Sequence, residues 1–535
     1  MNIGWIRKTF CVIFSVIILT IGTSGVTNAE ITGDASIVPG TEPEKPLGFD
    51  IVQQSAAYSV EPFKLVFGLN NIEGSLAEKT ERYTSTAVKT SETYKIKSIG
   101  STWGYVAFDT YSFLNGDLYY YLKYTPINSK AGEIRFILPY LPGPFDLRTV
   151  EYPKGLDYST SVIKLHEKQS IEDNALNKNL SPGSVYIDSD SLFCFFSYAS
   201  VYERKPNKIR EELYDKAANI SVTAKGIVVA LPSGGTGSFT EQWGLISKEK
   251  LVDWKDKQSV DAIRIADMNR VRKWGGDGQY YMLPVGYSPY SAAGFYRNNA
   301  NHIGNKFITG GCKGRLFEDY GFVTTDTLVR TQNDDGFWAT SPLSDWLYKD
   351  YKIGAGFFDT RWDTEAALSL LRGYRKYGEP EALEAACKFA DFYCDFTSEH
   401  SYKTANGGTL VYDYGFIPIP GIKTHVSLNH LLNEMNFLLE MYITTEDKTY
   451  ADTAGKILKG VRDTSSSWRN PANGDLHYAY MGNGKYGLKD YPTLTLNDLK
   501  YSRSLIKKVF GVEDAAIAKL ITIKEKYLTA HKIAY

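Results

Sequence analysis

Hydrophobic and polar residues alternate in short segments over residues 50–247. The segments Trp103 to Tyr111 and Leu118 to Tyr124 are rich in aromatic and β-branched residues, and the turn Asn115-Gly116-Asp117 lies between them. Alternation with a period of two and a turn of this composition indicate antiparallel strands. Because such segments follow one another without helical periodicity between them, we predict an antiparallel β-sandwich-like domain for residues 50–247.

After residue 247 the apolar positions take on helical spacing. From Thr360 onward they form three pairs of amphipathic segments with short links, which is typical of helix hairpins. The pairs are Thr360 to Tyr377 with Pro380 to Phe396, Val426 to Ile443 with Lys448 to Val461, and Leu496 to Phe510 with Glu513 to Ala530. Stacked hairpins each bury one face, so we predict an (α/α) barrel or toroid for residues 248–535.

Four further stretches have less regular patterns. Val260 to Trp274 has helical spacing, and the charged stretch Glu203 to Ala217 fits either one helix or a long loop. Gly275 to Gly314 and Thr397 to Lys423 are rich in Tyr, Gly, Asn and Pro, which predicts long loops. Loops of this length usually carry function, so we expect functional residues in or next to them.

Residues 1–29 have the three parts of a secretory signal. Two basic residues come first, Phe10 to Ile21 is mostly apolar, and Thr27 to Ala29 provide small residues at a cleavage site. The apolar run is shorter than the ~20 residues of a membrane-spanning helix, so we expect cleavage and export, with an uncleaved anchor as the alternative. The proline-containing residues 30–49 predict a linker.

The charge of the chain is balanced. The formal net charge is -1 and 43% of the residues are hydrophobic, which suits a globular protein and gives no electrostatic footprint for nucleic acid or an anionic membrane. A local cleft could still hold a polyanion. The 39 tyrosines favour a carbohydrate partner, because phenol rings cover sugar faces while their hydroxyls bind sugar hydroxyls.

Four cysteines follow the signal, namely Cys194, Cys312, Cys387 and Cys394. The last two are seven residues apart on a predicted helix and therefore about 10 Å apart, which is too far for a disulfide. We expect buried free thiols. The sequence contains no CxxC pair and no HExxH motif, so no metal and no cofactor are predicted.

Four patches combine acidic, amide, basic and aromatic residues in or next to the predicted loops of the helical part. They are Gln332 to Trp338, Phe358 to Asp363, Tyr412 to Tyr414 with His425, Asn429 and His430, and His477 to Tyr480 with Asp490 to Pro492. In an (α/α) barrel the loops at one end converge, so these patches could share one site. Each also has a structural explanation: Asp334-Asp335-Gly336 is a turn signal, and Asp359 or Thr360 is placed to cap a helix.

Residues 334–528 resemble the catalytic C-terminal domain of the D-glucuronyl C5-epimerases. The resemblance is carried by Asp335 to Trp338, Trp362 to Tyr377, Tyr412 to Tyr442 and Asp475 to Leu499. The family inverts C5 of uronate residues in heparan-type polysaccharides, and it has a β-rich N-terminal part followed by an α/α domain. The resemblance therefore implies an isomerase that acts on a glucuronate-containing polysaccharide, and the signal pattern of residues 1–29 predicts its export.

Inversion at C5 needs a base on one face of the sugar, a proton donor on the other and neutralisation of the carboxylate. The resemblance implies that tyrosines transfer the protons. The catalytic candidates are Tyr412, Tyr414, Tyr478, Tyr480 and Tyr491. The substrate-binding candidates are Arg361, Arg297, Arg330, Asp334, Asp335, Trp338, Trp362 and Asn429, with Arg361 first in line to pair the carboxylate. Pro492 stands where the family has a histidine.

Two other classes of function remain open. A lyase would share the proton abstraction and expel the C4 oxygen, whereas a hydrolase needs two carboxylates, for which Asp334, Asp363 and Asp413 are candidates. A cell-surface glycan-binding protein would use the tyrosines only as stacking surfaces.

Overall fold

A computed structural model describes most of the chain after the predicted N-terminal segments. The described residues are 49–52, 57–60, 63–67, 72–138, 144–151, 164–171, 178–180, 183–213, 219–223, 226–263, 272–299 and 301–535. The predicted signal, residues 1–29, and the predicted linker up to residue 48 lie outside them. In the described part of the chain, each helix is too short or too polar to cross a membrane.

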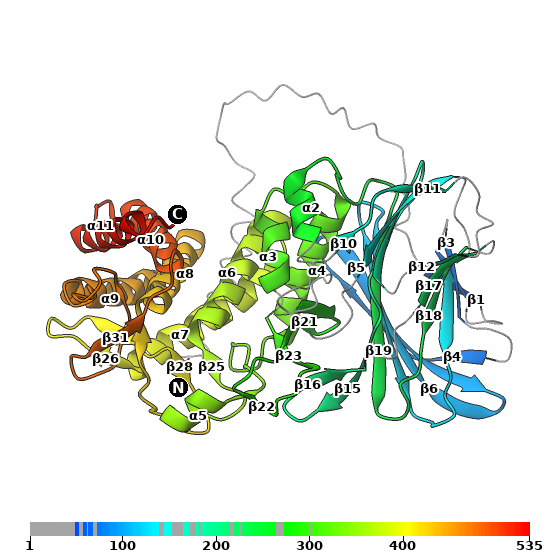
Figure 1. Ribbon diagram of the computed structural model, residues 1–535, viewed down its shortest axis with the longest axis horizontal. Coiled ribbons are helices and arrows are strands. Elements are labelled where there is room, and N and C mark those ends of the chain that lie inside the picture. The colour runs from blue at the N-terminus through cyan, green and yellow to red at the C-terminus, as the bar shows by residue number, and fades with distance from the viewer. Residues whose placement is uncertain are drawn as a thin grey trace. The chain divides into compact units, whose positions relative to one another are not determined.

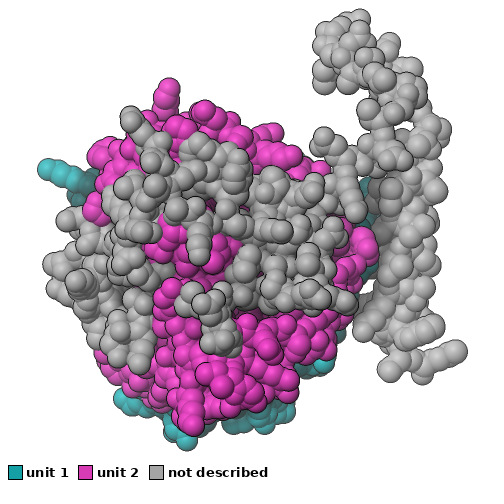
Figure 2. Space-filling model, turned by 90° about the vertical axis from the view of Figure 1, so that its right-hand side faces the viewer, with its two compact units in different colours: residues 1–27, 328–375, 380–535 teal, residues 28–327, 376–379 magenta. Residues whose placement is uncertain are grey.

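The described residues fall into two compact units, which Figure 2 colours separately. The β unit comprises the described residues up to Thr327 together with 376–379, and the helical unit comprises 328–375 and 380–535. The domain boundary predicted after residue 247 stays a prediction, but β-structure continues beyond that point, because three later strands join the main sheet.

Two antiparallel sheets form the described part of the β unit. The smaller sheet has the order β1 (Phe49–Val52), β2 (Ala57–Val60), β3 (Phe63–Phe67), β8 (Ile134–Leu138), β18 (Gly226–Leu231), β17 (Asn219–Thr223) and β12 (Lys178–Leu180). The path of the larger sheet is β10 (Lys164–Leu165), β9 (Phe145–Glu151), β13 (Gly183–Ser189), β14 (Phe193–Phe196), β19 (Ser238–Ser247), β15 (Ser200–Lys205), β16 (Ile209–Glu212), β23 (Gly294–Asn298), β21 (Gly278–Met282) and β20 (Arg272–Gly275). Beside that path, β11 (Gln169–Ile171) pairs with β9, and β4 (Ile72–Tyr83), β5 (Ala87–Ser98), β6 (Ser101–Phe113) and β7 (Leu118–Pro126) pair in sequence before β7 joins β19.

One apolar core is shared by both sheets. Phe108, Leu122 and Val185 come from the larger sheet and pack in the same cluster as Phe136 and Val229 from the smaller one. This arrangement confirms the prediction of a large antiparallel β-region in this part of the chain. It follows from the alternation of the strands, because every second residue of β6 and β7 enters the core.

The structure corrects two predictions in the β unit. Glu203 to Ala217 is neither a helix nor a loop in its described part, because it continues β15 and forms β16. Val260 to Trp274 is not one helix: α2 (Lys257–Ile263) is short, and β20 begins at Arg272.

The predicted long loops are also more regular than expected. Gly275 to Gly314 contains β21, β22 (Tyr287–Ser288), β23 and α3 (Asn301–Thr309). Thr397 to Lys423 contains the end of a helix followed by β26 (Ser401–Lys403), β27 (Thr409–Val411) and β28 (Tyr414–Gly415).

The helical unit contains the three predicted hairpins, visible in yellow-green to red in Figure 1. They are α6 (Thr360–Tyr377) with α7 (Pro380–Glu399), α8 (Leu428–Thr445) with α9 (Lys448–Thr464), and α10 (Leu494–Phe510) with α11 (Ala515–Ala530). Helix α8 packs against both α9 and α10, and its residues 428–441 are all buried. Before the hairpins come α4 (Arg315–Thr331), which belongs to the β unit up to Thr327, and then β24 (Leu343–Ser344) and α5 (Asp345–Tyr351).

The hairpin ends have the cap residues that the sequence predicts. Gly378 has φ +70° directly after α6, a conformation that glycine adopts without strain, and Pro380 begins α7. Asp447 caps α9 by accepting a hydrogen bond from the Thr449 amide at 2.8 Å. Local signals therefore fixed the hairpin ends closely.

Candidate active site

Three short strand pairs hold the loops in front of helices α6, α8 and α10. β25 (Phe358–Asp359) pairs with β28, and β29 (Val426–Ser427) pairs with β30 (His477–Tyr480), which also pairs with β31 (Tyr486–Lys489). Each of β25 and β29 runs directly into a helix. Because the pairs join segments that are far apart in sequence, the second, third and fourth predicted patches meet in one region of the helical unit.

Asp413 lies at the centre of this region and is completely buried. Its carboxylate accepts hydrogen bonds from the Ser427 amide at 2.7 Å and from the Ser427 hydroxyl. The ring of His425 contacts the same carboxylate through Nε2 at 3.2 Å. Burial acts to raise the pKa of Asp413, but the neighbouring histidines and the Ser427 hydrogen bonds outweigh it and hold the pKa below the usual range. Asp413 is therefore ionised at neutral pH.

His425 connects Asp413 to the hydroxyl of Tyr351. An ionised carboxylate is only an acceptor, so Nε2 of His425 carries the proton and Nδ1 is left as an acceptor. Nδ1 lies 3.1 Å from the Tyr351 hydroxyl, which then donates. Tyr351 is half-buried, and this burial raises its pKa. The result is a hydrogen-bonded chain from a buried carboxylate through an imidazole to a phenol that solvent reaches.

Burial shifts the pKa of other groups around Asp413 toward their neutral forms. Burial lowers the pKa of His430 to about 4, and its Nδ1 lies 2.9 Å from the Thr360 hydroxyl. Burial raises the pKa of Asp359 to about 7 and that of Glu434 to about 8, and the Asp413 charge adds to both shifts. Asp413 is thus the one of these three carboxyls that holds a full negative charge at neutral pH.

Aromatic rings surround the Tyr351 to Asp413 chain. Trp346 on α5 is 40% exposed, and its ring centre lies 5.7 Å from that of Tyr414 and 5.9 Å from that of His425. Tyr478 lies 6.1 Å from His425 and 5.7 Å from Tyr491, which is 50% exposed. Rings that are partly exposed next to a polar group provide the surface on which a sugar face can stack.

The structure divides the five predicted tyrosines into two groups. Tyr414, Tyr478 and Tyr491 form the wall around His425. Tyr412 and Tyr480 instead pack on Tyr402, at centre distances of 4.8 and 5.1 Å. The Tyr480 hydroxyl accepts a hydrogen bond from the Gly484 amide, which ties it to its own hairpin.

Arg361 does not have a free guanidinium. It is 7% exposed and contacts Asp498 at 2.8 and 3.4 Å, Glu365 at 3.0 Å and the Asn429 carbonyl at 2.7 Å. These partners use most of its donors. The structure therefore places Arg361 in an internal ion pair between α6, α8 and α10, contrary to the expectation that it meets a substrate carboxylate.

The remaining candidates lie in ordinary structural positions. Asp334 and Asp335 are exposed in a turn, and Trp338 is buried and donates to the Leu328 carbonyl. The side chain of Asn429 is buried. Trp362 is partly buried in the first turn of α6, where its amide donates to Asp359.

The other two arginines are separate cases. Arg330 is exposed at the end of α4. Arg297 belongs to the β unit, where its Nε donates to the Asp277 carbonyl.

The sequence interpretation missed Tyr351 and Trp346. Both lie in Asp345–Tyr351, a short helix that precedes the first recognised hairpin. The sequence does contain a weak signal, because Trp346 and Tyr351 are aromatic residues with polar tips and lie next to a glycine-rich segment. Nothing local, however, distinguishes them from the many other aromatic residues of the chain. The sequence did select His425 and, in the same patch, its partner Asp413, but not its partner Tyr351.

Among the described residues, no three His, Cys, Asp or Glu side chains converge in a way that could hold a metal ion. All four predicted thiols are free; Cys312 is half-buried, and Cys194, Cys387 and Cys394 are buried. Burial raises the pKa of Cys312 and therefore keeps its thiol protonated.

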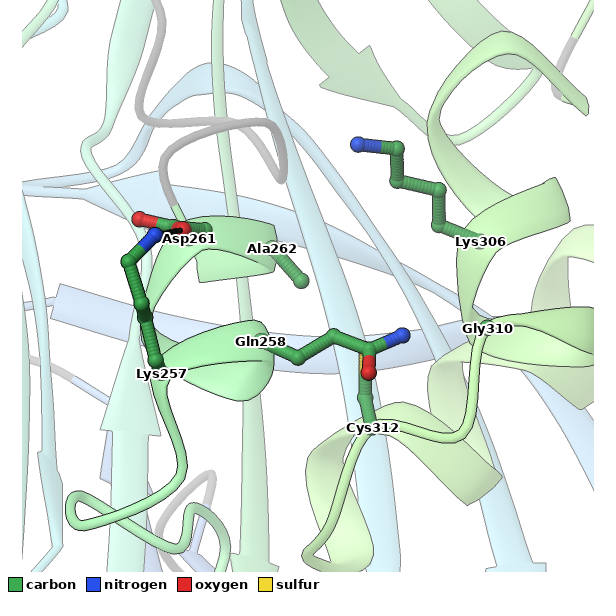
Figure 3. Close-up of a pocket in the computed structure, with 7 residues that line it drawn as sticks. All are labelled: Lys257, Gln258, Asp261, Ala262, Lys306, Gly310 and Cys312. Atoms are coloured by element: carbon green, nitrogen blue, oxygen red, sulfur yellow. Dashed lines mark hydrogen bonds and ion pairs between the residues drawn. The ribbon is translucent and has the colours of Figure 1, made fainter.

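The β unit also contains a hollow lined by Lys257, Lys306 and Cys312. It has a volume of about 470 Å³ and lies between α2 and the end of α3 (Figure 3). Lys257 forms an ion pair with Asp261 at 2.5 Å, whereas Lys306 extends from α3 and Cys312 lies nearby. With one cation neutralised and the thiol protonated, these groups offer no reactive pair.

No protein-family model and no curated protein sequence matches this chain. Among solved structures, a family 76 glycoside hydrolase from a bovine Bacteroides thetaiotaomicron strain is 10% identical over 76% of this chain and 74% of its own, with a TM-score of 0.36. A D-mannose isomerase is 14% identical (43% of this chain, 58% of its own, TM-score 0.32), and a cellobiose 2-epimerase from Bacillus thermoamylovorans B4167 is 12% identical (43% and 57%, TM-score 0.33).

These likenesses are too distant to assign a fold family or an activity. The chain spans less than three fifths of the two isomerases' length. The resemblance to the D-glucuronyl C5-epimerases therefore stays a hypothesis, and the function has to be argued from the residues of this chain.

Proposed function

We propose that this chain is a carbohydrate-active enzyme that transfers protons at a sugar ring, and that the helical unit holds the reacting groups. The observation that carries the proposal is the chain Tyr351, His425, Asp413, with contacts of 3.1 and 3.2 Å. A phenol backed by an imidazole and a carboxylate can accept a proton from substrate while it passes its own proton to Nδ1. The positive charge that develops on His425 is stabilised by Asp413.

The surroundings of Tyr351 fit a sugar better than a small polar metabolite. Trp346 and Tyr491 are each exposed over about half of their surface, and Tyr478 lies between Tyr491 and His425. Three rings around one acid–base group would orient a pyranose by stacking, while their polar tips meet its hydroxyls.

Within this class we propose uronate C5-epimerisation as the reaction. The C5 proton next to a carboxylate is removed by Tyr351 through His425, and a second phenol, Tyr491 or Tyr478, returns a proton to the other face. Burial raises the pKa of Tyr478, so this phenol is protonated and able to donate. Since Arg361 is already paired with Asp498, hydrogen-bond donors would have to stabilise the substrate carboxylate.

A lyase would use the same proton abstraction and is the second candidate. A hydrolase fits less well, because its three candidate carboxylates do not face one another across an open site. Asp413 and Asp363 are fully buried and hydrogen-bonded, and Asp334 lies in an exposed turn.

Solvent exchange tests the proposal directly. The full chain is incubated with a glucuronate-containing polymer in deuterated water, and C5 is followed by NMR. We expect deuterium at C5 together with the inverted product. Absorbance from an unsaturated uronate would identify a lyase, new reducing ends without that absorbance would identify a hydrolase, and binding without any exchange would leave a glycan-binding protein.

Tyr491→Phe sharpens this test. The substitution removes one half-exposed hydroxyl, so folding should be preserved while turnover is lost. Normal exchange in the variant would remove Tyr491 from the mechanism and leave Tyr478 as the second phenol.

We also propose that the protein is exported. The support is the tripartite pattern of residues 1–29 in the sequence. Edman sequencing of the protein from the culture medium should begin near Glu30, and recovery of the uncleaved chain in the membrane fraction would contradict export.

A further inference from the structure

A basic pocket lies between one face of α11 and the turn that precedes β30. Its volume is about 510 Å³. Among its lining residues are Arg469, Asn473, Lys519, Thr522, Lys526 and His531, and no carboxylate lines it. Lys519, Thr522 and Lys526 recur at helical spacing, so one face of α11 presents two ammonium groups toward the same hollow.

The cations of this pocket have no counter-ion within the helical unit, all of which is described. No ion pair involves Arg469, Lys519 or Lys526 there. Three exposed cations on the neighbouring helix α10 are paired instead: Lys500 contacts Glu525 at 3.0 Å, and Arg503 and Lys507 contact Glu513 at 2.8 and 3.0 Å. Three unpaired positive charges around one hollow are an arrangement that binds anions.

The wall of the pocket is held in place by hydrogen bonds. In the turn from Asn470 to Asp475, the Asn470 amide donates to the Asp475 carbonyl at 2.8 Å, and the Gly474 amide donates to the Asn470 carbonyl at 2.9 Å. Lys524 on α11 is fully buried and contacts both oxygens of Asp475, at 2.9 and 3.2 Å. The turn and the helix therefore form one preorganised cradle.

The same lysine connects the pocket to the candidate active site. Lys524 also contacts Asp490 at 2.7 Å, and Asp490 directly precedes Tyr491. From Gly474 in the pocket, four residues along the chain lead to Tyr478, a span of about 13 Å for an extended strand. A polymer that places one sugar at Tyr351 and Tyr491 could therefore reach the pocket with another.

We propose that this pocket is a second binding site for an anionic polysaccharide, in which Arg469, Lys519 and Lys526 hold a carboxylate or sulfate of a sugar other than the reacting one. This inference rests on the proposed function, because it assumes that the substrate is a charged polymer. Planar Arg469 can hold an anionic group with two hydrogen bonds, while the two lysines act as point charges.

The test compares two variants that remove the same number of positive charges. One is Arg469→Gln/Lys519→Gln/Lys526→Gln, and the other is Lys500→Gln/Arg503→Gln/Lys507→Gln on α10. Affinity of each full chain for non-sulfated glucuronate polymer and for its sulfated counterpart is measured by calorimetry at two salt concentrations. The pocket variant should bind roughly tenfold more weakly at low salt, with a reduced salt dependence, whereas the α10 variant should lie within about twofold of the original protein.

Three outcomes would overturn the proposal. Equal weakening in both variants would show that only the net charge matters, and equal loss of binding to a neutral glucan would show damaged folding. Equal loss for a DNA oligonucleotide of matched charge would show a general polyanion surface. The sulfated and non-sulfated polymers tell which anionic group the pocket prefers.

The result is separable from that of the proposed reaction. Deuterium exchange at C5 of a short oligosaccharide, too short to reach the pocket, should be unchanged in the pocket variant. If the original protein shows no exchange at C5 but binds polymer through the pocket, the proposed reaction is wrong and the proposed binding site stands.

Discussion

Each compact unit contains a buried network of charged and aromatic side chains, and the two networks end differently. In the β unit, Arg210 contacts Glu241 at 2.5 Å and Asp277 at 2.9 Å. Its guanidinium also lies over the rings of Tyr202 and Tyr280, 4.3 and 3.4 Å from their centres. In the helical unit, the Asp413 carboxylate passes through His425 to the Tyr351 hydroxyl, which solvent reaches.

The difference shows which of two similar networks can act on a substrate. In the β unit, carboxylates of the protein itself balance the charge of Arg210, so this network stabilises the sheet and offers no unpaired charged group to a ligand. Arg210, Glu241, Asp277, Tyr202 and Tyr280 are called the closed network below. In the helical unit, neutral donors bind the Asp413 carboxylate, and the Tyr351 hydroxyl at the other end can contact a ligand. Asp413, His425 and Tyr351 are called the open network below. The rings of Trp346, Tyr414 and Tyr478 lie around His425, the partner of that hydroxyl.

The largest effect is expected from opening the closed network. Arg210→Met keeps most of the side-chain length but removes the closest cation from the buried Glu241, which keeps only the Tyr202 hydroxyl and, at 3.8 Å, Lys123. The free energy of unfolding should therefore fall by about 3–5 kcal/mol. Urea unfolding measures the loss. As a control, Arg135→Met removes an arginine from the exposed pair with Glu133 and should cost less than about 1 kcal/mol. Similar values for both variants would contradict the closed-network interpretation.

Removing the last hydroxyl of the open network should act on the rate instead. Tyr351→Phe is expected to slow deuterium exchange at C5 by at least about 100-fold, or roughly 3 kcal/mol of activation free energy, because the proton then has no path to His425. Its free energy of unfolding should change little. Tyr348→Phe, at an exposed position on the same helix, is the matched control. Full activity of Tyr351→Phe would contradict the proposed role of Tyr351, His425 and Asp413 in proton transfer.

The raised pKa values of Asp359 and Glu434, two buried carboxyls that the Asp413 charge influences, predict a pH dependence of stability. The pKa of Asp359 is about 7 in the folded protein and close to 3.8 when unfolded, so the folded state binds the extra proton between these values. Stability should therefore fall as the pH rises from about 4 to 7, by up to about 1.4 kcal/mol per pH unit. Asp359→Asn should remove this contribution, while the raised pKa of Glu434 keeps its own.

Chemical unfolding across that pH range measures the slope for each protein. Asp334→Asn, in the exposed turn, should retain the slope of the original chain. A slope for Asp359→Asn as steep as that of the original chain would show that Asp359 is ionised in the folded state.

The smallest effect is expected from removing one hydroxyl from the closed network. Tyr280→Phe loses the hydrogen bond to Asp277 at 2.8 Å and should lower the free energy of unfolding by about 1 kcal/mol. Exchange at C5 should stay normal. The pair Tyr280→Phe and Tyr351→Phe therefore makes the same chemical change in both networks, and equal effects on exchange would erase the distinction between them.

Much of the fold could be predicted because its signals are local. The three hairpins of the helical unit follow from helical spacing between short links, and the predicted ends lie within a few residues of α6 to α11. The strands β6 and β7 follow from alternation on either side of Asn115 to Asp117. In contrast, β15 and β16 were missed because their charged residues, such as Arg210 and Glu212, face partners on other strands.

The candidate site was predicted only in part. The sequence singled out the stretch from Tyr412 to Tyr414, His425, and the region of Tyr478 and Tyr491, since acidic, basic and aromatic residues gather there. It could not tell Tyr478 from Tyr480, because which residue approaches His425 depends on how β29 pairs with β30. It also could not show that Asp498 forms an ion pair with Arg361, because the two residues are 137 positions apart in sequence.

The sequence by itself determined the elements of this protein: a strand-rich part, a hairpin-rich part and a set of polar aromatic segments. These depend on spacing and turn chemistry within a few residues. Only the tertiary structure decided which polar groups are used up by internal partners and which are left to bind. That distinction arises from contacts between distant segments, where burial and pairing set the charge of Asp413 and the partner of Tyr351.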